Sequence, residues 1–150
     1  MSVLLALAIQ AATARQSLGL FERWGAFSDP QRCFAIAQPV RAREGGFASI
    51  ASFPARGLRN QFHARLSRAR SPRAQVTLSI GERRFQLVAG TTDAWAPDAR
   101  TDAAIVAAIR SARSMSVESV DAKGRAYADT YALRGAATAI DAAAVACARR

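Results

Sequence analysis

Residues 75–88, QVTLSIGERRFQLV, contain two short alternating runs with a turn between them. In the first run aliphatic side chains alternate with hydroxyl side chains, and Phe85 and Leu87 continue the alternation in the second. Alternation with a period of two predicts half-buried strands, and Gly81-Glu82 predicts a tight turn between antiparallel partners. This hairpin makes the predicted fold class mainly β.

Three segments before this hairpin also predict strands. Residues 32–38 (RCFAIAQ) and 47–53 (FASIASF) are short apolar runs, and a proline ends each of them. Residues 61–67 (QFHARLS) alternate cleanly between an apolar and a polar face. After the helical region, residues 115–120 and 126–133 flank Asp-Ala-Lys-Gly, a good hairpin loop.

Two segments show helical spacing instead. Residues 98–114 repeat apolar residues on one face, and Thr101 or Asp102 can serve as the N-cap. Residues 136–148 are alanine-rich, with Ile140, Ala144 and Cys147 on one stripe. We therefore predict an α+β chain: a compact antiparallel β-sandwich or partly open barrel, with one helix near 101–113 and a C-terminal helix near 136–148.

The first fourteen residues read as a secretory signal peptide. An apolar run over residues 3–9 is followed by Ala12-Thr13-Ala14, an A-x-A-like cleavage site before Arg15. No basic residue precedes the run, and the alternative is a short buried helix. The run is too short to span a bilayer, so no transmembrane segment is expected. The predicted organisation is a signal peptide at 1–14 and a single domain at 15–150.

The chain has two cysteines, Cys33 and Cys147. An exported chain meets an oxidising compartment, where thiols pair, so we predict a disulfide between them. Closing a loop of this length stabilises a fold by about 4–5 kcal/mol in the chain-entropy model. The alternative is two unrelated buried thiols in a cytosolic protein. A metal site is not expected, because His63 is the only histidine.

The formal net charge is +10, and 20 of the 21 basic residues are arginines. No acidic residue occurs between Gly45 and Gly81. An acid-free basic stretch can attract phosphate polymers or anionic membrane surfaces. Nucleic-acid binding is not favoured, since a GC-rich coding sequence also replaces lysine by arginine. The candidate anion-binding residues are Arg56, Arg59, Arg65, Arg68, Arg70 and Arg73.

No motif for catalysis or for a cofactor stands out. The sequence lacks the G-x-S-x-G, P-loop, dinucleotide and metalloprotease patterns. His63 lies mid-strand on the polar face, and an enzymatic role would require a carboxylate beside it in a pocket. Trp24 and Trp95 fit either a binding surface or the edges of a small core. We therefore expect no enzyme, no catalytic residue and no cofactor.

Several short strings, in order and spacing, resemble the invasion-associated locus B family of exported proteins from Gram-negative bacteria. The resemblance covers residues 24–147, almost all of the predicted mature chain. The strings are Trp24-Gly25-x-Phe27, RCFAIAQP at 32–39, VTLSI at 76–80, Phe85-x-Leu87, Trp95-Ala96, TDAAIVAAIR at 101–110, Met115-x-Val117, Lys123-Gly124 and DTYALRG at 129–135.

The resemblance implies a β-rich fold, a periplasmic, outer-membrane-associated or secreted location, and no known catalytic residues. One departure is the segment 67–72 (SRARSP), which stands where the family tends to have an aromatic turn. The expected function is thus a non-enzymatic exported protein that acts in the envelope or on a host, through a partner that the sequence does not name. The alternative is an anion-binding module whose arginines contact lipopolysaccharide or nucleic acid.

Overall fold

The structure is a computed structural model and describes residues 15–150. The predicted signal peptide and its cleavage site therefore lie outside the described residues. The strands are β1 Gln16–Phe21, β2 Trp24–Ser28, β3 Cys33–Ala37, β4 Phe47–Phe53, β5 Leu58–Arg65, β6 Val76–Ile80, β7 Arg83–Ala89, β8 Asp93–Trp95, β9 Ser114–Val120 and β10 Ala126–Ala132. The α-helices are α1 Ala99–Ser111 and α2 Ala136–Ala148, and the short 3-10 turns are η1 Ala42–Glu44 and η2 Pro54–Arg56.

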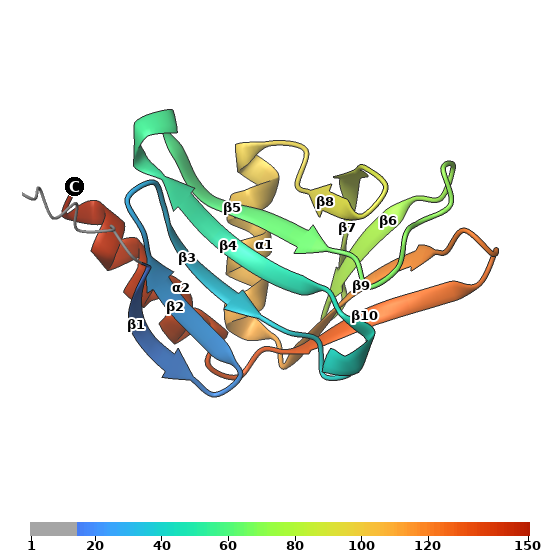
Figure 1. Cartoon of the computed structure of the whole chain (residues 1–150), viewed down its shortest axis with the longest axis horizontal. Helices are drawn as coiled ribbons and strands as arrows, with labels where there is room; N and C mark the ends of the chain where they lie inside the picture. The colour runs from blue at the N-terminus through green and yellow to red at the C-terminus, as the bar shows by residue number, and fades with distance from the viewer. Residues whose placement is uncertain (1–14) are drawn as a thin grey trace, which may run out of the picture.

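All ten strands join one antiparallel sheet in the order β1-β2-β3-β4-β5-β8-β7-β6-β9-β10 (Figure 1). The sheet is not closed, but its last strand contacts β2 and the loop after β3. Val40 N donates to Thr130 O at 2.8 Å, and Trp24 Nε1 donates to Ala132 O at 2.8 Å. The mainly β prediction is confirmed, and the arrangement corresponds to the partly open barrel among the two predicted architectures.

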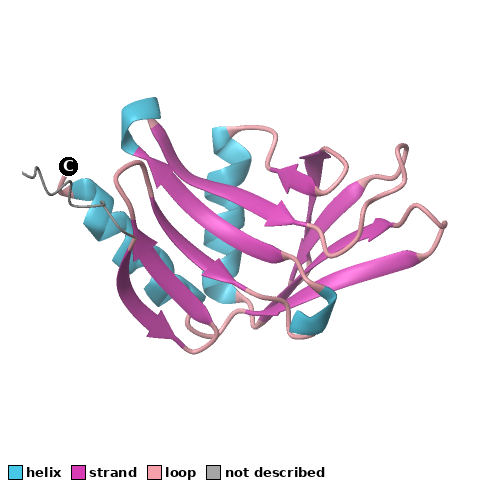
Figure 2. Cartoon of the chain, viewed as in Figure 1, coloured by secondary structure: helices cyan, strands magenta, loops and turns pink. Residues whose placement is uncertain are grey.

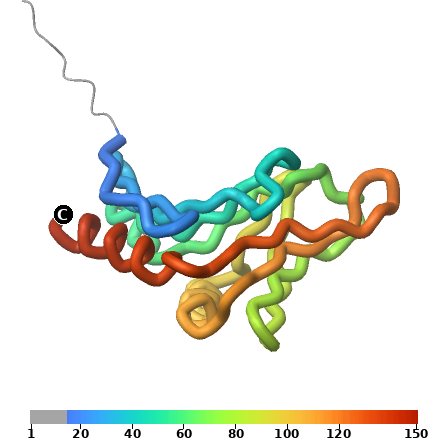
Figure 3. Tube along the Cα trace, turned by 90° about the horizontal axis from the view of Figure 1, so that it is seen from below, coloured from blue at the N-terminus to red at the C-terminus, as the bar shows by residue number. Residues whose placement is uncertain are grey.

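Both α-helices cover the same face of the sheet (Figures 2 and 3). Helix α2 packs against β1–β4, and α1 packs against β5, β6 and β7. The core lies between the helices and this inner face, with Trp24, Phe62 and Ile105 all fully buried. Among residues 15–150, neither helix is long and apolar enough to cross a membrane.

The strands predicted at 32–38, 47–53, 61–67, 115–120 and 126–133 are confirmed, as are the hairpin at 75–88 and both helices. The predicted N-cap of α1 is wrong. Asp98 is the N-cap, and its side chain accepts a hydrogen bond from Thr101 N at 2.7 Å. Asp102 instead points into the core, where its Oδ1 accepts a hydrogen bond from Phe62 N at 2.9 Å. The side chain of Asp102, which the local sequence pattern predicted to cap the helix, therefore makes a tertiary contact instead.

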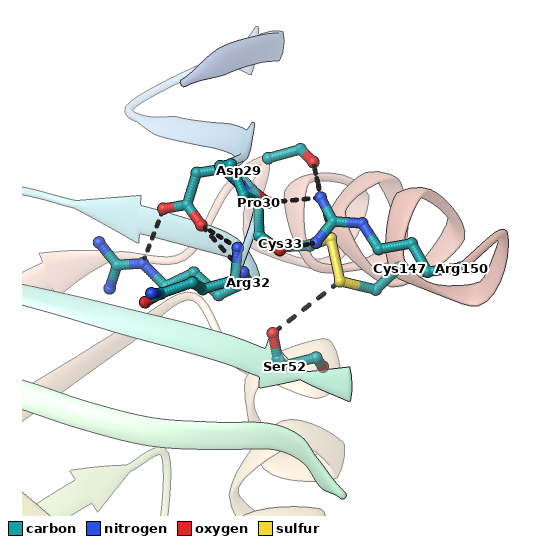
Figure 4. A network of polar contacts seen from close by, with 9 residues as sticks. Asp29, Pro30, Arg32, Cys33, Ser52, Cys147 and Arg150 are labelled. Atoms are coloured by element: carbon teal, nitrogen blue, oxygen red, sulfur yellow. Dashed lines mark hydrogen bonds and ion pairs between the residues drawn. A yellow bond between two sulfur atoms is a disulfide. The ribbon is translucent and has the colours of Figure 1, made fainter. Parts of the chain in front are cut away.

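The buried stripe of α2 also differs by one residue from the prediction. Ala143 is buried with Ile140 and Cys147, whereas Ala144 is only half-buried. This places Cys147 against β3, where it forms the predicted disulfide with Cys33 (Figure 4). The link joins the third strand to the last helix across 114 residues.

A cluster of polar contacts surrounds the disulfide. Cys147 Sγ lies 3.9 Å from Ser52 O, on the strand next to β3. The Arg150 guanidinium donates to Ser28 Oγ at 2.6 Å and to Pro30 O at 3.2 Å (Figure 4). Asp29 shapes the same turn by accepting a hydrogen bond from Arg32 N at 2.9 Å. The β2–β3 turn is thus tied to the end of α2 by covalent and polar contacts together.

Candidate functional site

His63 has a carboxylate within hydrogen-bond reach. Its Nε2 lies 2.7 Å from Asp93 Oδ1, on the face of the sheet away from the helices, which we call the outer face. The imidazole stacks on Trp95 with centroids 5.2 Å apart and meets the edge of Phe47 at 5.5 Å. His63 and Asp93 are therefore close enough to form the histidine–carboxylate pair that the enzymatic hypothesis requires.

The surroundings of this pair give it a structural task. Asp93 Oδ1 also accepts from Arg65 Nε at 2.9 Å, and Asp93 Oδ2 accepts from Thr92 Oγ1 at 3.2 Å. Burial acts to raise the pKa of Asp93, but the hydrogen bonds from His63 and Thr92 and the charge of Arg65 outweigh it and lower that pKa. His63 lines none of the cavities described below. The pair anchors β5 to β8. Among the described residues, no hydroxyl or thiol group is hydrogen-bonded to His63.

Three of the six candidate anion-binding arginines have partners within the protein. Arg65 pairs with Asp93, as above, and Arg68 lies 3.4 Å from Asp121 and 4.0 Å from Glu44. Arg70 is the most engaged, because its guanidinium donates to five backbone carbonyls. These belong to Gly90, Ser71, Pro72, Ala74 and Ala89, at 2.6–3.3 Å.

The other three candidates carry no ion pair to the described residues. Arg56 covers the Phe53 ring at 5.2 Å, and Arg59 lines a small cavity of about 250 Å³ beside Cys147. Both lie near the start of β5, whereas Arg73 is exposed in the connection that follows β5. The structure therefore does not gather the six arginines at one place.

A row of paired residues crosses the outer face from β1 to β7, and we call it the long row. Strand register pairs each member with the next, so that neighbours are within reach of each other. In order across the sheet they are Leu20, Gly25, Ile36, Ser49, His63, Trp95 and Val88. Large apolar side chains are exposed at both ends: Leu20 is 77% exposed and Val88 is 56% exposed.

A groove lies over the β1–β4 end of the long row, and we call it the outer groove. It has a volume of about 560 Å³ and is lined chiefly by Leu20, Gly25, Phe27, Ile36 and Phe47, with the loop after β3. Gly25 shapes it, because a Cβ at this position would lie 2.6 Å from the Phe27 ring and 3.3 Å from a Leu20 methyl group. The absent side chain lets these two apolar groups lean together over the strand.

The rim of the outer groove is cationic. Arg15 and Arg23 line it, and no carboxylate of residues 15–150 does. The Arg15 guanidinium lies 5.3 Å from the Phe34 ring centroid and 5.8 Å from that of Phe27, which fixes its charge beside the groove. The nearby Glu22 pairs with Arg134 at 3.4 Å.

A second, polar cleft lies between η1 and β10, with a volume of about 480 Å³. Asp129 forms part of its wall and accepts hydrogen bonds from the backbone N and the hydroxyl group of Ser67. Burial raises the pKa of Asp129, and the nearby charge of Glu44 raises it further. Arg68 neutralises part of this acidic surface by lying between Glu44 and Asp121. The contacts connect the segment after β5 to the β9–β10 hairpin.

The two tryptophans differ in whether they lie in the core or at a surface that could bind a partner. Trp24 is fully buried in the core, as the core-edge interpretation expects. Trp95 is 37% exposed on the outer face, beside Val88, so the binding-surface interpretation remains available for it. Sequence reasoning missed the outer groove, although the large apolar residues at Leu20 and Ile36 were visible. It assigned Ile36 to a buried strand, because it did not predict β1 and β2, whose outer face forms the groove.

Comparison with known proteins supports the fold. Scans of protein-family models and of curated proteins give no match. The chain is structurally similar to the crystal structure of invasion associated protein B from Bartonella henselae, with a TM-score of 0.61 and 15% sequence identity. The match covers 90% of this chain and 99% of the other. At this identity the likeness establishes a shared fold, and it confirms the fold implied by the sequence resemblance.

Proposed function

We propose that this chain is an exported, non-enzymatic protein of the bacterial envelope that acts by binding a partner in the periplasm, at the outer membrane or on a host surface. The observation that carries the proposal is the disulfide between Cys33 and Cys147. Such bonds form and persist in oxidising compartments such as the periplasm, and they are rare in the bacterial cytosol.

The fold gives separate support. Its likeness to invasion associated protein B links the chain to a protein whose name concerns invasion. Fold alone does not fix function, so a host-directed role is the narrower part of the proposal. The outer face fits a binding protein, because Leu20 at one end and Val88 and Trp95 at the other leave apolar surface exposed, and exposed apolar patches mark interaction sites.

The decisive experiment is to fractionate the native host and examine the chain by intact-mass spectrometry with thiol alkylation. We expect a chain that lacks residues 1–14, contains no free thiol and occurs in the periplasmic or envelope fraction. An intact, unprocessed chain with two alkylated cysteines in the cytosol would overturn the proposal. Pull-down from envelope extract with the oxidised protein then addresses the partner.

The anion-binding alternative has support from Arg56, Arg59 and Arg73, which are exposed and carry no ion pair to the described residues. Binding to lipopolysaccharide or nucleic acid should weaken steeply with salt. The informative variant is Arg56→Glu with Arg59→Glu, because Arg70 holds the fold through its carbonyl contacts and its reversal would damage the structure. A flat response between roughly 50 and 200 mM salt would exclude this function.

A further inference from the structure

We propose that the outer groove binds a single-chain amphiphile with an anionic head group, of the fatty-acid type. The groove would hold the alkyl chain, and Arg23, in the β1–β2 turn at its rim, would contact the head, while Arg15 adds positive charge at the other end of β1. This inference goes beyond the proposed envelope role and does not depend on it, because it concerns binding by the purified protein.

The shape of the outer groove fits an alkyl chain. Its volume of about 560 Å³ lies within the range of small-molecule sites, which are mostly apolar with a few polar groups at defined places. The lining residues come from four neighbouring strands, β1 to β4, and the loop after β3. Four strands at the usual spacing span about 14 Å, comparable to an extended dodecyl chain. Phe27 and Leu20 cover Gly25, so the floor of this path is apolar in its middle.

The charge at the rim selects the sign of the head group. Both charged residues that line the outer groove are arginines. Arg23 is exposed and makes no ion pair with any described residue, and the guanidinium of Arg15 is held over the Phe27 and Phe34 rings. The closest acidic residue in sequence, Glu22, is already paired with Arg134. An arginine next to an apolar surface binds carboxylate or phosphate oxygens through charge-assisted hydrogen bonds.

A single bound molecule fits this site better than a membrane surface does. A groove lined by apolar side chains from four strands holds one chain along its length, whereas a bilayer surface requires protruding apolar groups spread over a flat or convex face. Leu20 projects beside the groove on the edge strand β1 and can fold over a bound chain. We therefore commit to the monomeric amphiphile, and the experiment includes vesicles as a separate arm.

The test is calorimetric titration of the oxidised protein, expressed from the full chain, with three dodecyl compounds below their aggregation concentrations. We expect dodecanoate to bind at least about tenfold more tightly than dodecan-1-ol, since only the carboxylate makes a charge-assisted hydrogen bond to the arginine. Dodecyltrimethylammonium should bind more weakly than dodecan-1-ol. Equal affinity for dodecanoate and dodecan-1-ol, or binding only to phosphatidylglycerol vesicles, would overturn the proposal.

Variants with matched controls assign the binding to the outer groove. Arg23→Glu should weaken dodecanoate binding about tenfold and leave dodecan-1-ol binding within about twofold, whereas Arg84→Glu, an exposed arginine on β7, should change neither. Leu20→Gln should weaken both ligands about fivefold, while Val145→Gln on α2 should not. All four positions are exposed, so circular dichroism should show native folding. An equal loss in a variant and its control would place the binding elsewhere.

Discussion

The outer face of the sheet differs sharply between its two halves. Over β1–β5 and β8 it carries the outer groove and the long row as far as Trp95, with aromatic and aliphatic side chains and an arginine rim. Val88 on β7 is the last member of the long row and lies at the boundary between the halves. Over β7, β6, β9 and β10 the corresponding row is polar, and we call it the polar row. Its members, in order across the sheet, are Arg84, Ser79, Ser116 and Thr130.

The contrast shows that packing of the core does not explain the apolar half. Both halves bury apolar side chains on the inner face, and the polar row shows that an outer face made of hydroxyl groups is compatible with this sheet. The hydroxyl groups of Ser116 and Thr130 lie 3.0 Å apart and form a half-buried hydrogen bond. The sheet itself therefore does not require the apolar outer surface of the first half. The two halves also differ in cross-linking, because the disulfide ties only the first half to α2.

The largest expected effect comes from breaking the disulfide. Cys147→Ser should lower the free energy of unfolding by about 4–5 kcal/mol, because the unfolded chain regains the freedom of a loop of more than a hundred residues. Urea denaturation monitored by circular dichroism measures the change. Reducing agent should lower the stability of the wild type by a similar amount and leave Cys147→Ser unchanged.

Hydrogen exchange adds a regional readout to this prediction. Amides of β2 and β3 should lose more protection on reduction than amides of β9 and β10, because only the former lie beside the bond. Equal losses in both halves would mean that the sheet opens as one unit, and superimposable unfolding curves before and after reduction would contradict the prediction altogether.

Trp24→Phe tests the contact that joins the two halves. The substitution removes the hydrogen bond from the buried indole to the carbonyl of the half-buried Ala132 and opens a small cavity. We expect a loss of about 2–3 kcal/mol in the free energy of unfolding. The control is Trp95→Phe, since Trp95 is partly exposed and should cost less than about 1 kcal/mol. A similar loss of stability in both variants would show that the hydrogen bond from Trp24 to β10 does not account for the effect.

Asp129→Asn tests the carboxyl group that connects the segment after β5 to the hairpin of the second half. Burial raises the pKa of Asp129 in the folded state, so the folded protein binds this proton more tightly than the unfolded chain. The resulting stability is fully present below the ordinary aspartate pKa of about 3.9 and is lost as the pH rises through the raised value.

Asparagine should therefore increase stability at pH 7 by up to about 1 kcal/mol, with the gain disappearing in acid. Urea midpoints measured at pH 7 and at pH 4 provide the comparison. Asp93 serves as the comparison, because its pKa is lowered in the folded state and its ionised carboxylate stabilises the fold at pH 7. Asp93→Asn should therefore lower the stability at pH 7. A gain for Asp129→Asn that persists unchanged in acid would exclude ionisation as its cause.

Ser79→Ala has the smallest expected effect and examines the polar row itself. The Ser79 hydroxyl is buried and has no hydrogen-bond partner among the described residues. Its removal should increase stability by about 0.5–1 kcal/mol. Ser116→Ala, which breaks the pair with Thr130, should lower stability by a similar amount in the same thermal or urea assay. A loss in both variants would show that Ser79 has a partner such as water.

The sequence was most informative where side chains alternate. The hairpin at 75–88 and the strand at 61–67 each have one buried and one open face, so their period identifies them. Strand β2 escaped prediction because both of its faces are covered: Trp24, Gly25 and Ala26 are all buried in succession. Strand β8 has only three residues, too few to show a period.

The candidate site was less predictable than the fold, since it depends on partners distant in sequence. The acid-free stretch suggested one basic patch, but Arg70 turns toward backbone carbonyls and Arg65 toward Asp93, which lies 28 residues later. The outer groove needs Leu20 and Ile36 to meet across Gly25, and that requires the register of three strands. The pairing of Cys33 with Cys147 could be predicted, because two cysteines allow one intramolecular bond.

The separation of the two cysteines also has a consequence in time. Cys147 is synthesised 114 residues after Cys33, so the Cys33 thiol has no partner in the chain until then. At typical rates of synthesis this takes on the order of ten seconds. In an oxidising compartment, the only disulfide open to Cys33 during this interval is one with another molecule, such as a thiol-oxidising enzyme or a second copy of the chain. Rapid pairing of β2, β3 and β4, which buries Cys33, would shield the thiol from such mixed disulfides until α2 arrives.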